Sequence, residues 1–163
     1  MIRLDGSSLT TKSVISIMQG DTQVELDEKV RTSVEKARHA VEEIVSSGKP
    51  AYGINTGFGD LVSVAISHKD LTTLQENLVR SHACGMGESM DPCHVLGMMT
   101  IRANSLLKGN SGIRWNTIQN IISMIQARIA PVIPRIGSLG ASGDLAPLAC
   151  LLYTSDAADE WRS

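Results

Sequence analysis

Apolar residues recur at every third or fourth position along four segments of this 163-residue chain, and this spacing restricts its fold more than any other feature. The period places the apolar side chains on one face of a helix, and that face must pack against another element. Val30, Val34, Ala37 and Val41 mark the first of these faces. The segments predicted to be helical are residues 27–47, 71–82, 92–109 and 118–125.

Residues typical of helix ends flank these segments. Gly48 follows the first segment, where a glycine often ends a helix. Asp91 and Pro92 provide an N-cap and a first-turn proline for the third segment. Ser67 and Asp70 have the spacing of a capping box before the second, with Asp in place of Glu. We therefore expect an all-α, mainly helical protein, with short N-terminal strands near residues 2–4 and 23–26.

Composition excludes several classes of partner. A formal net charge of −2 gives no field strong enough to hold nucleic acid or an anionic membrane surface. The first residues lack the apolar stretch of a signal peptide, and no apolar run is long enough to span a bilayer. Three cysteines without a C-x-x-C pair suggest neither a disulfide framework nor a zinc site. Residues 39–43 also lack the second histidine of a zinc helix, so we predict no metal. The missing signal peptide and the lack of a disulfide framework predict a cytoplasmic location.

Two irregular, glycine-rich segments remain, at residues 52–60 and 131–143. Aromatic residues make up only 3% of the chain, yet Tyr52 and Phe58 both fall in the first of these segments. Packing alone gives little reason to place two of so few aromatic side chains there. Because function often lies on loops held by a rigid scaffold, both segments are candidates for chemistry.

The second segment contains a tripeptide with a specific chemical possibility. In Ala141-Ser142-Gly143, attack of the Gly143 amide nitrogen on the Ala141 carbonyl carbon would close a five-membered ring. Dehydration and loss of the Ser142 hydroxyl would then leave an imidazolone with an electrophilic methylidene carbon. Asp144 and Pro147 are typical of a first helical turn, whose partial positive charge would stabilise negative charge developing on that group.

The tripeptide alone has plainer interpretations. A serine in a flexible turn before a helix is one, and a glycine-rich turn that binds an anion at a helix N-terminus is another. No Gly-Lys-Ser/Thr follows, so a P-loop is not indicated. The spacing also differs from the G-x-S-x-G elbow of hydrolases.

Three longer strings, in the same order, resemble the aromatic amino-acid ammonia-lyases and aminomutases. They are Tyr52-Gly-Ile-Asn-Thr-Gly-Phe-Gly59, Asn77-Leu-Val-Arg-Ser-His82 and Gly140-Ala-Ser-Gly-Asp-Leu-Ala-Pro-Leu-Ala149. The resemblance implies the N-terminal part of a helical-bundle lyase, with a methylidene-imidazolone group formed autocatalytically from Ala141, Ser142 and Gly143. It also implies that Tyr52 is the base, although a tyrosine acts as a base only where its surroundings stabilise the phenolate.

The residues that match the family's substrate-contacting pair are Ser81 and His82. Ser-His resembles the histidine-specific members, whereas phenylalanine-specific members tend to have Phe-Leu and tyrosine-specific members His-Leu. An imidazole can exchange a hydrogen bond with the substrate imidazole. The expected reaction is therefore elimination of ammonia from L-histidine to give trans-urocanate. The alternatives are a lyase or aminomutase for phenylalanine or tyrosine, or a non-catalytic helical fragment whose glycine-rich turn packs or binds an anion.

The resemblance ends at Ala149. We interpret residues 1–149 as the N-terminal portion of the catalytic domain, and residues 150–163 as a non-native tail that resembles translated adapter DNA. The family implies a homotetramer whose active sites draw on three subunits, and further catalytic groups beyond this sequence. The fragment alone is therefore expected to be inactive.

Overall fold

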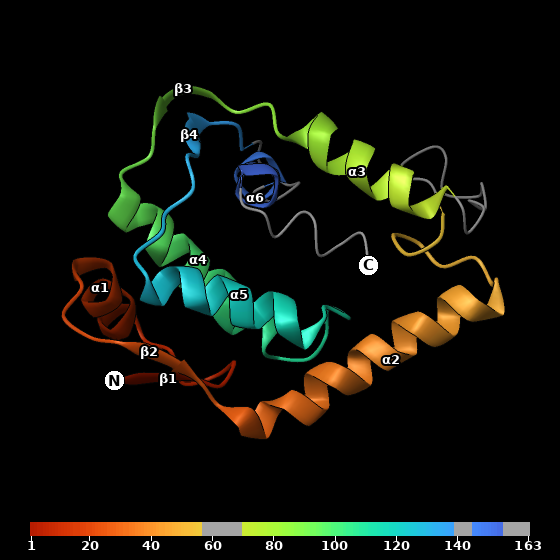
Figure 1. Cartoon of the computed structure of the whole chain (residues 1–163), viewed down its shortest axis with the longest axis horizontal. Helices are drawn as coiled ribbons and strands as arrows, with labels where there is room; N and C mark the ends of the chain where they lie inside the picture. The colour runs from red at the N-terminus through yellow and green to blue at the C-terminus, as the bar shows by residue number, and fades with distance from the viewer. Residues whose placement is uncertain (57–69, 139–144, 155–163) are drawn as a thin grey trace.

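The computed structural model describes residues 1–56, 70–138 and 145–154, and their fold is mainly helical (Figure 1). This agrees with the fold class predicted from the apolar spacing. No helix in these three ranges is long and apolar enough to cross a membrane. The elements, in chain order, are β1 (Ile2–Leu4), α1 (Thr11–Gln19), β2 (Val24–Leu26), η1 (Glu28–Val30), α2 (Arg31–Ser47), α3 (Leu71–His82), β3 (Met86–Ser89), α4 (Pro92–Leu106), α5 (Trp115–Gln126), β4 (Pro134–Ile136) and α6 (Leu145–Thr154).

Helices α4 and α5 form the centre of the fold. They pack on each other, α1 packs on α4, and α2 contacts α5 (Figure 1). Val95, Met99 and Ala103 of α4 are buried, as are Ile118 and Ile122 of α5. Removal of these apolar side chains from water is the main contribution to the stability of such a core. Helix α6 packs against α3 on the other side of the molecule.

The helix ends confirm most of the predicted caps. The Asp91 carboxylate accepts a hydrogen bond from the Cys93 N–H at 2.8 Å, with Pro92 in the first turn of α4. Gly48 ends α2 in the left-handed conformation, where a glycine has no steric penalty. Gly109 also has a positive φ and follows the end of α4. Asp70 stands at the N-cap of α3 without a side-chain capping bond, and Ser67 lies outside the described residues.

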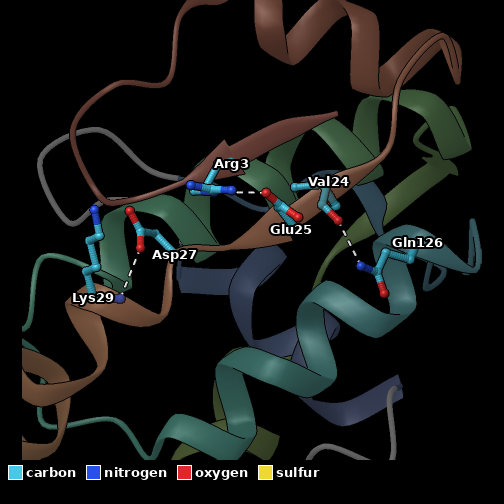
Figure 2. A network of polar contacts seen from close by, with 6 residues as sticks. All are labelled: Arg3, Val24, Glu25, Asp27, Lys29 and Gln126. Carbon is cyan, nitrogen blue, oxygen red and sulfur yellow. Dashed lines mark hydrogen bonds and ion pairs between the residues drawn. The ribbon is translucent and has the colours of Figure 1, made fainter.

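The two predicted N-terminal strands pair in parallel and attach to the helical core. Ile2 lies opposite Val24 and Leu4 opposite Leu26. Gln126, at the end of α5, donates its side-chain N–H to the Val24 carbonyl at 2.8 Å (Figure 2). Arg3 and Glu25 form an exposed ion pair across the two strands at 2.8 Å. Strand β2 is therefore bonded both to β1 and to the end of α5.

Three elements were not predicted from the apolar pattern. Helix α1 has its own signals, because the Thr10 hydroxyl accepts from the Ser13 N–H and Gly20 ends the helix. Strands β3 and β4 pair antiparallel, with Met86 opposite Ile136, and β4 lies inside the segment expected to be irregular. Both strands are short and largely exposed, so they lack the alternating pattern that identifies a half-buried strand.

Candidate active site

Tyr52 lies in a tight turn that follows α2. The Asn55 side chain holds this turn: its carbonyl oxygen accepts from the Ala51 N–H at 2.7 Å, and its amide donates to the Lys49 carbonyl at 2.9 Å. Asn55 is buried, and Gly53 has a positive φ of 74° within the turn. Tyr52 itself is 64% exposed. The sequence thus builds a fixed backbone turn that presents the phenol at the surface of this chain.

His82 is the last residue of α3, and its ring is held by the helix that carries it. The Nδ1 atom lies 2.8 Å from the Leu78 carbonyl oxygen, which can only accept a hydrogen bond. Nδ1 must therefore carry the proton and donate. Ser81 also donates its hydroxyl to the same carbonyl at 2.8 Å, and its Oγ lies 3.1 Å from Nδ1. In the neutral ring this leaves Nε2 as a hydrogen-bond acceptor.

A junction of small residues connects the end of α3 to β4 and α6. A Cβ atom placed on Gly137 would lie 2.8 Å from the Ala146 Cβ and 3.3 Å from the Gly85 Cα. A Cβ atom on Gly85 would lie 3.0 Å from the Pro134 Cβ. Real Cβ atoms essentially never approach to 2.8 Å, and 3.0 Å is tighter than most real contacts, so the close packing here depends on glycine at positions 137 and 85. We call Gly85, Gly137 and Ala146 the small-residue junction, and no sequence motif indicates it.

Ala141, Ser142 and Gly143 lie outside the described residues, but both ends of their segment are described. Strand β4 ends at Ile136, and α6 begins at Leu145, directly after Asp144. The tripeptide therefore precedes a helix N-terminus, as the sequence predicted. Free backbone N–H groups and the helix dipole at such an end favour nearby negative charge. These flanking elements fit a group that accepts electrons at the tripeptide.

One cavity is shared by the elements that carry the three motifs. It has a volume of about 420 Å³, and its lining includes Gly53 and Ile54 from the Tyr52 turn, Gln75 from α3, and Leu148 and Leu151 from α6. The remaining walls come from α2, α4, α5 and the segment before α5. The Tyr52 turn, α3 and α6 therefore converge on one interior.

Although the elements that carry the motifs line this cavity, the side chains of Tyr52 and His82 do not. The residues that line the cavity include neither Tyr52 nor His82. His82 is half-buried at the end of α3, and Tyr52 is largely exposed. The described part of the chain thus positions both residues on a common scaffold without enclosing them in that cavity.

Helix α6 continues past Ala149, the last residue of the third matching string. It runs to Thr154, and both Cys150 and Leu151 are buried. Residues 155–163 lie outside the described residues. The assignment of residues 150–163 to a non-native tail stays a prediction, and the first two of its residues pack in the core.

The junction yields a prediction about the scaffold. Gly137→Ala should lower the free energy of unfolding by about 1–3 kcal/mol, because the added methyl group overpacks the contact with Ala146. It should also speed amide hydrogen exchange in the first turn of α6. Both quantities can be measured, by urea unfolding and by hydrogen exchange.

A second substitution is the control. In Gly137→Ala/Ala146→Gly the methyl group moves to the other side of the contact, so part of the lost stability should return despite the helix cost of glycine. A Gly137→Ala variant as stable as the parent chain would show that the close approach does not constrain the fold.

Known proteins resemble this chain over most of its length. The aromatic amino acid lyase family model matches residues 9–154. The chain is 48% identical to the histidine ammonia-lyase of Bacillus subtilis over 151 residues, which are 93% of this chain and 30% of that protein. It is 46% identical to the Streptococcus gordonii enzyme of the same name, over 91% of this chain and 29% of that protein.

A solved structure gives the same relationship. The histidine ammonia-lyase of Trypanosoma cruzi superposes with a TM-score of 0.80 at 32% identity, over 99% of this chain and 33% of that one. The chain thus spans about three-tenths of the length of its curated relatives. The resemblance noted from three short strings extends through the described fold, and the chain belongs to the aromatic amino acid lyase family.

Proposed function

We propose that this chain is the N-terminal part of a histidine ammonia-lyase, which eliminates ammonia from L-histidine to give trans-urocanate. Identities of 46% and 48% to proteins named histidine ammonia-lyase support the reaction. The observation that carries the choice of substrate is the fixed ring of His82. Its Nδ1 is occupied by Leu78, so Nε2 can accept a hydrogen bond from the N–H of a substrate imidazole. An apolar residue at this position could not do so.

The proposed prosthetic group is a methylidene-imidazolone formed by cyclisation of Ala141, Ser142 and Gly143. Its exposed methylidene carbon supplies an electrophile that makes the substrate amine a better leaving group. The start of α6 at Leu145 supports this placement, because the helix N-terminus favours the negative charge that develops there. No metal enters the proposed reaction.

Tyr52 is the proposed base that removes the β-proton as the carbon–nitrogen bond breaks. The Asn55-held turn fixes its backbone, which supports a positioned rather than a mobile phenol. A phenol ionises near pH 10, so its phenolate requires stabilising donors in the assembled site. We propose that these come from the rest of the protein and from neighbouring subunits of a homotetramer in the cytoplasm.

The function is tested with the protein extended to the length of its relatives. With L-histidine it should form urocanate, followed by ultraviolet absorbance, and a peptide containing residues 141–143 should weigh two waters less than its sequence mass. Ser142→Ala should keep the helical fold but lower turnover by about 10³-fold or more, because it removes the hydroxyl that must leave. The 163-residue chain alone should be inactive.

Each alternative has its own result in this experiment. Phenylalanine or tyrosine turned over in preference to histidine would make the protein a lyase or aminomutase of another specificity. An unmodified tripeptide in an active protein would contradict the proposed mechanism. An unmodified tripeptide in a well-folded, inactive protein would support the non-catalytic interpretation.

The role of Tyr52 is tested by removing one oxygen atom. Tyr52→Phe in the extended protein should lower turnover by about 10²–10⁴-fold, the contribution typical of a positioned acid or base. The two-water mass loss at residues 141–143 should persist, because the phenol takes no part in ring closure. Near-normal activity in this variant would assign the base to another residue.

The role of His82 is tested by changing the hydrogen-bond acceptor. Replacing Ser81 and His82 by Phe and Leu should lower kcat/KM for histidine by about 10²-fold or more and favour phenylalanine. The matched control is His39→Gln on α2, an exposed histidine 3.4 Å from Glu43, which should leave kcat/KM unchanged. Equal selectivity before and after the double substitution would remove His82 from substrate recognition.

A further inference from the structure

Three side chains of different chemistry converge where α4 begins. Asp91, Cys93 and His94 each offer one potential ligand atom, and these atoms all lie within 4.8 Å of one another. Asp91 and His94 are exposed and Cys93 is half-buried, so an ion from solvent can reach all three. The residues belong to none of the motifs assigned to the proposed active site.

The start of the helix brings these groups together. The Asp91 carboxylate caps α4 by accepting from the Cys93 N–H at 2.8 Å, and the His94 N–H donates to the Asp91 carbonyl at 2.9 Å. The carboxylate is therefore held beside the first turn, which carries Cys93 and His94. The Cys93 sulfur and an Asp91 carboxylate oxygen lie within 4.8 Å of each other.

The backbone around the cluster is anchored on a second element. The Met90 N–H donates to the Ile133 carbonyl at 2.8 Å, which fixes the residue before the cap to the segment that leads into β4. The positions from which the three side chains extend are thus set by the fold. Only side-chain rotation is needed to change the distances between the ligand atoms.

The separations fit a tetrahedral ion after a small adjustment. Bonds of roughly 2.3 Å to sulfur and 2.0–2.2 Å to nitrogen and oxygen place the ligand atoms of a tetrahedron roughly 3–4 Å apart. The widest separation in the cluster is within 4.8 Å, so it must contract by roughly 1–2 Å at most. Because two of its three side chains are exposed, rotation can supply this contraction without rearranging the core.

The ligand set selects a class of ion. One sulfur, one imidazole nitrogen and one carboxylate oxygen suit borderline divalent ions such as Zn²⁺, Co²⁺ or Ni²⁺, whereas Mg²⁺ and Ca²⁺ prefer oxygen ligands alone. A thiolate and a carboxylate would together balance a double positive charge. Three protein ligands leave a fourth position for water, as in open zinc sites.

We propose that Asp91, Cys93 and His94 form a binding site for a borderline divalent transition-metal ion, with water as its fourth ligand. The site is independent of the proposed lyase activity. It clamps the first turn of α4 by joining the cap residue to two side chains of the helix itself. The sequence alone did not indicate it, because Asp-Pro-Cys-His is neither a C-x-x-C pair nor a zinc helix.

Co²⁺ is the probe, because its spectrum reports both geometry and ligand type. The metal-free 163-residue chain, titrated with Co²⁺, should bind one equivalent and show the visible bands of a tetrahedral ion with a thiolate charge-transfer band. Addition of Zn²⁺ should abolish both. No such spectrum at millimolar Co²⁺, in a chain whose helices are intact by far-ultraviolet circular dichroism, would overturn the proposal.

Substitutions separate the site from an adventitious thiol. Cys93→Ser should abolish the charge-transfer band, and His94→Gln should weaken Co²⁺ binding at least about 10-fold. Asp91→Asn should weaken it similarly while preserving the helix, because asparagine caps a helix as well as aspartate does. Unchanged affinity in Asp91→Asn or His94→Gln would overturn the site as proposed.

The matched control is Cys84→Ser, which removes an exposed cysteine from the loop after α3. This variant should bind Co²⁺ with the affinity and spectrum of the parent chain. Loss of the charge-transfer band in Cys84→Ser would locate the thiolate ligand elsewhere and overturn the assignment to Cys93.

Discussion

The close packing of Gly85, Gly137 and Ala146 joins the elements that carry the proposed active site. His82 stands three residues before Gly85, and the tripeptide begins four residues after Gly137. Ala146 belongs to the first turn of α6, the helix that follows the tripeptide. One contact between small residues therefore joins the loop after α3 to the described residues on both sides of the tripeptide segment.

In the proposed enzyme, the electrophile forms from backbone atoms between two elements that other contacts hold in place. Ring closure requires the Gly143 amide nitrogen to approach the carbonyl carbon of Ala141, two residues earlier, which an ordinary turn does not favour. The described residues on either side of the tripeptide segment, at Gly137 and Leu145, are each held by another element. The antiparallel pairing of Met86 with Ile136 holds one of these ends, and the packing of α6 on α3 holds the other.

Sequence reasoning was most successful where the information is local. The ends of α2 and α4 follow from Gly48 and Asp91, whose backbone and side-chain chemistry act within one helical turn. The pairing of β3 with β4 joins residues about fifty positions apart and produces little burial, so no local sequence pattern predicts it. For the same reason the sequence could not show that Gly85 lies against Gly137. The bond between the His82 ring and the Leu78 carbonyl is local, but it depends on the side-chain rotamer of His82, which the sequence does not specify.

His82 and Tyr52, the two proposed site residues that the structure describes, differ in how far contacts within this chain determine their protonation chemistry. His82 receives its tautomer from the helix that carries it, since the Leu78 carbonyl accepts from Nδ1. Tyr52 has a fixed backbone, but a phenol that is 64% exposed keeps much of its contact with water. Hydrogen-bond donors stabilise a phenolate most effectively where water is excluded, because the effective dielectric constant is lower there. In the proposed enzyme, the tautomer of His82 is therefore set by α3, whereas activation of Tyr52 depends on the assembled site.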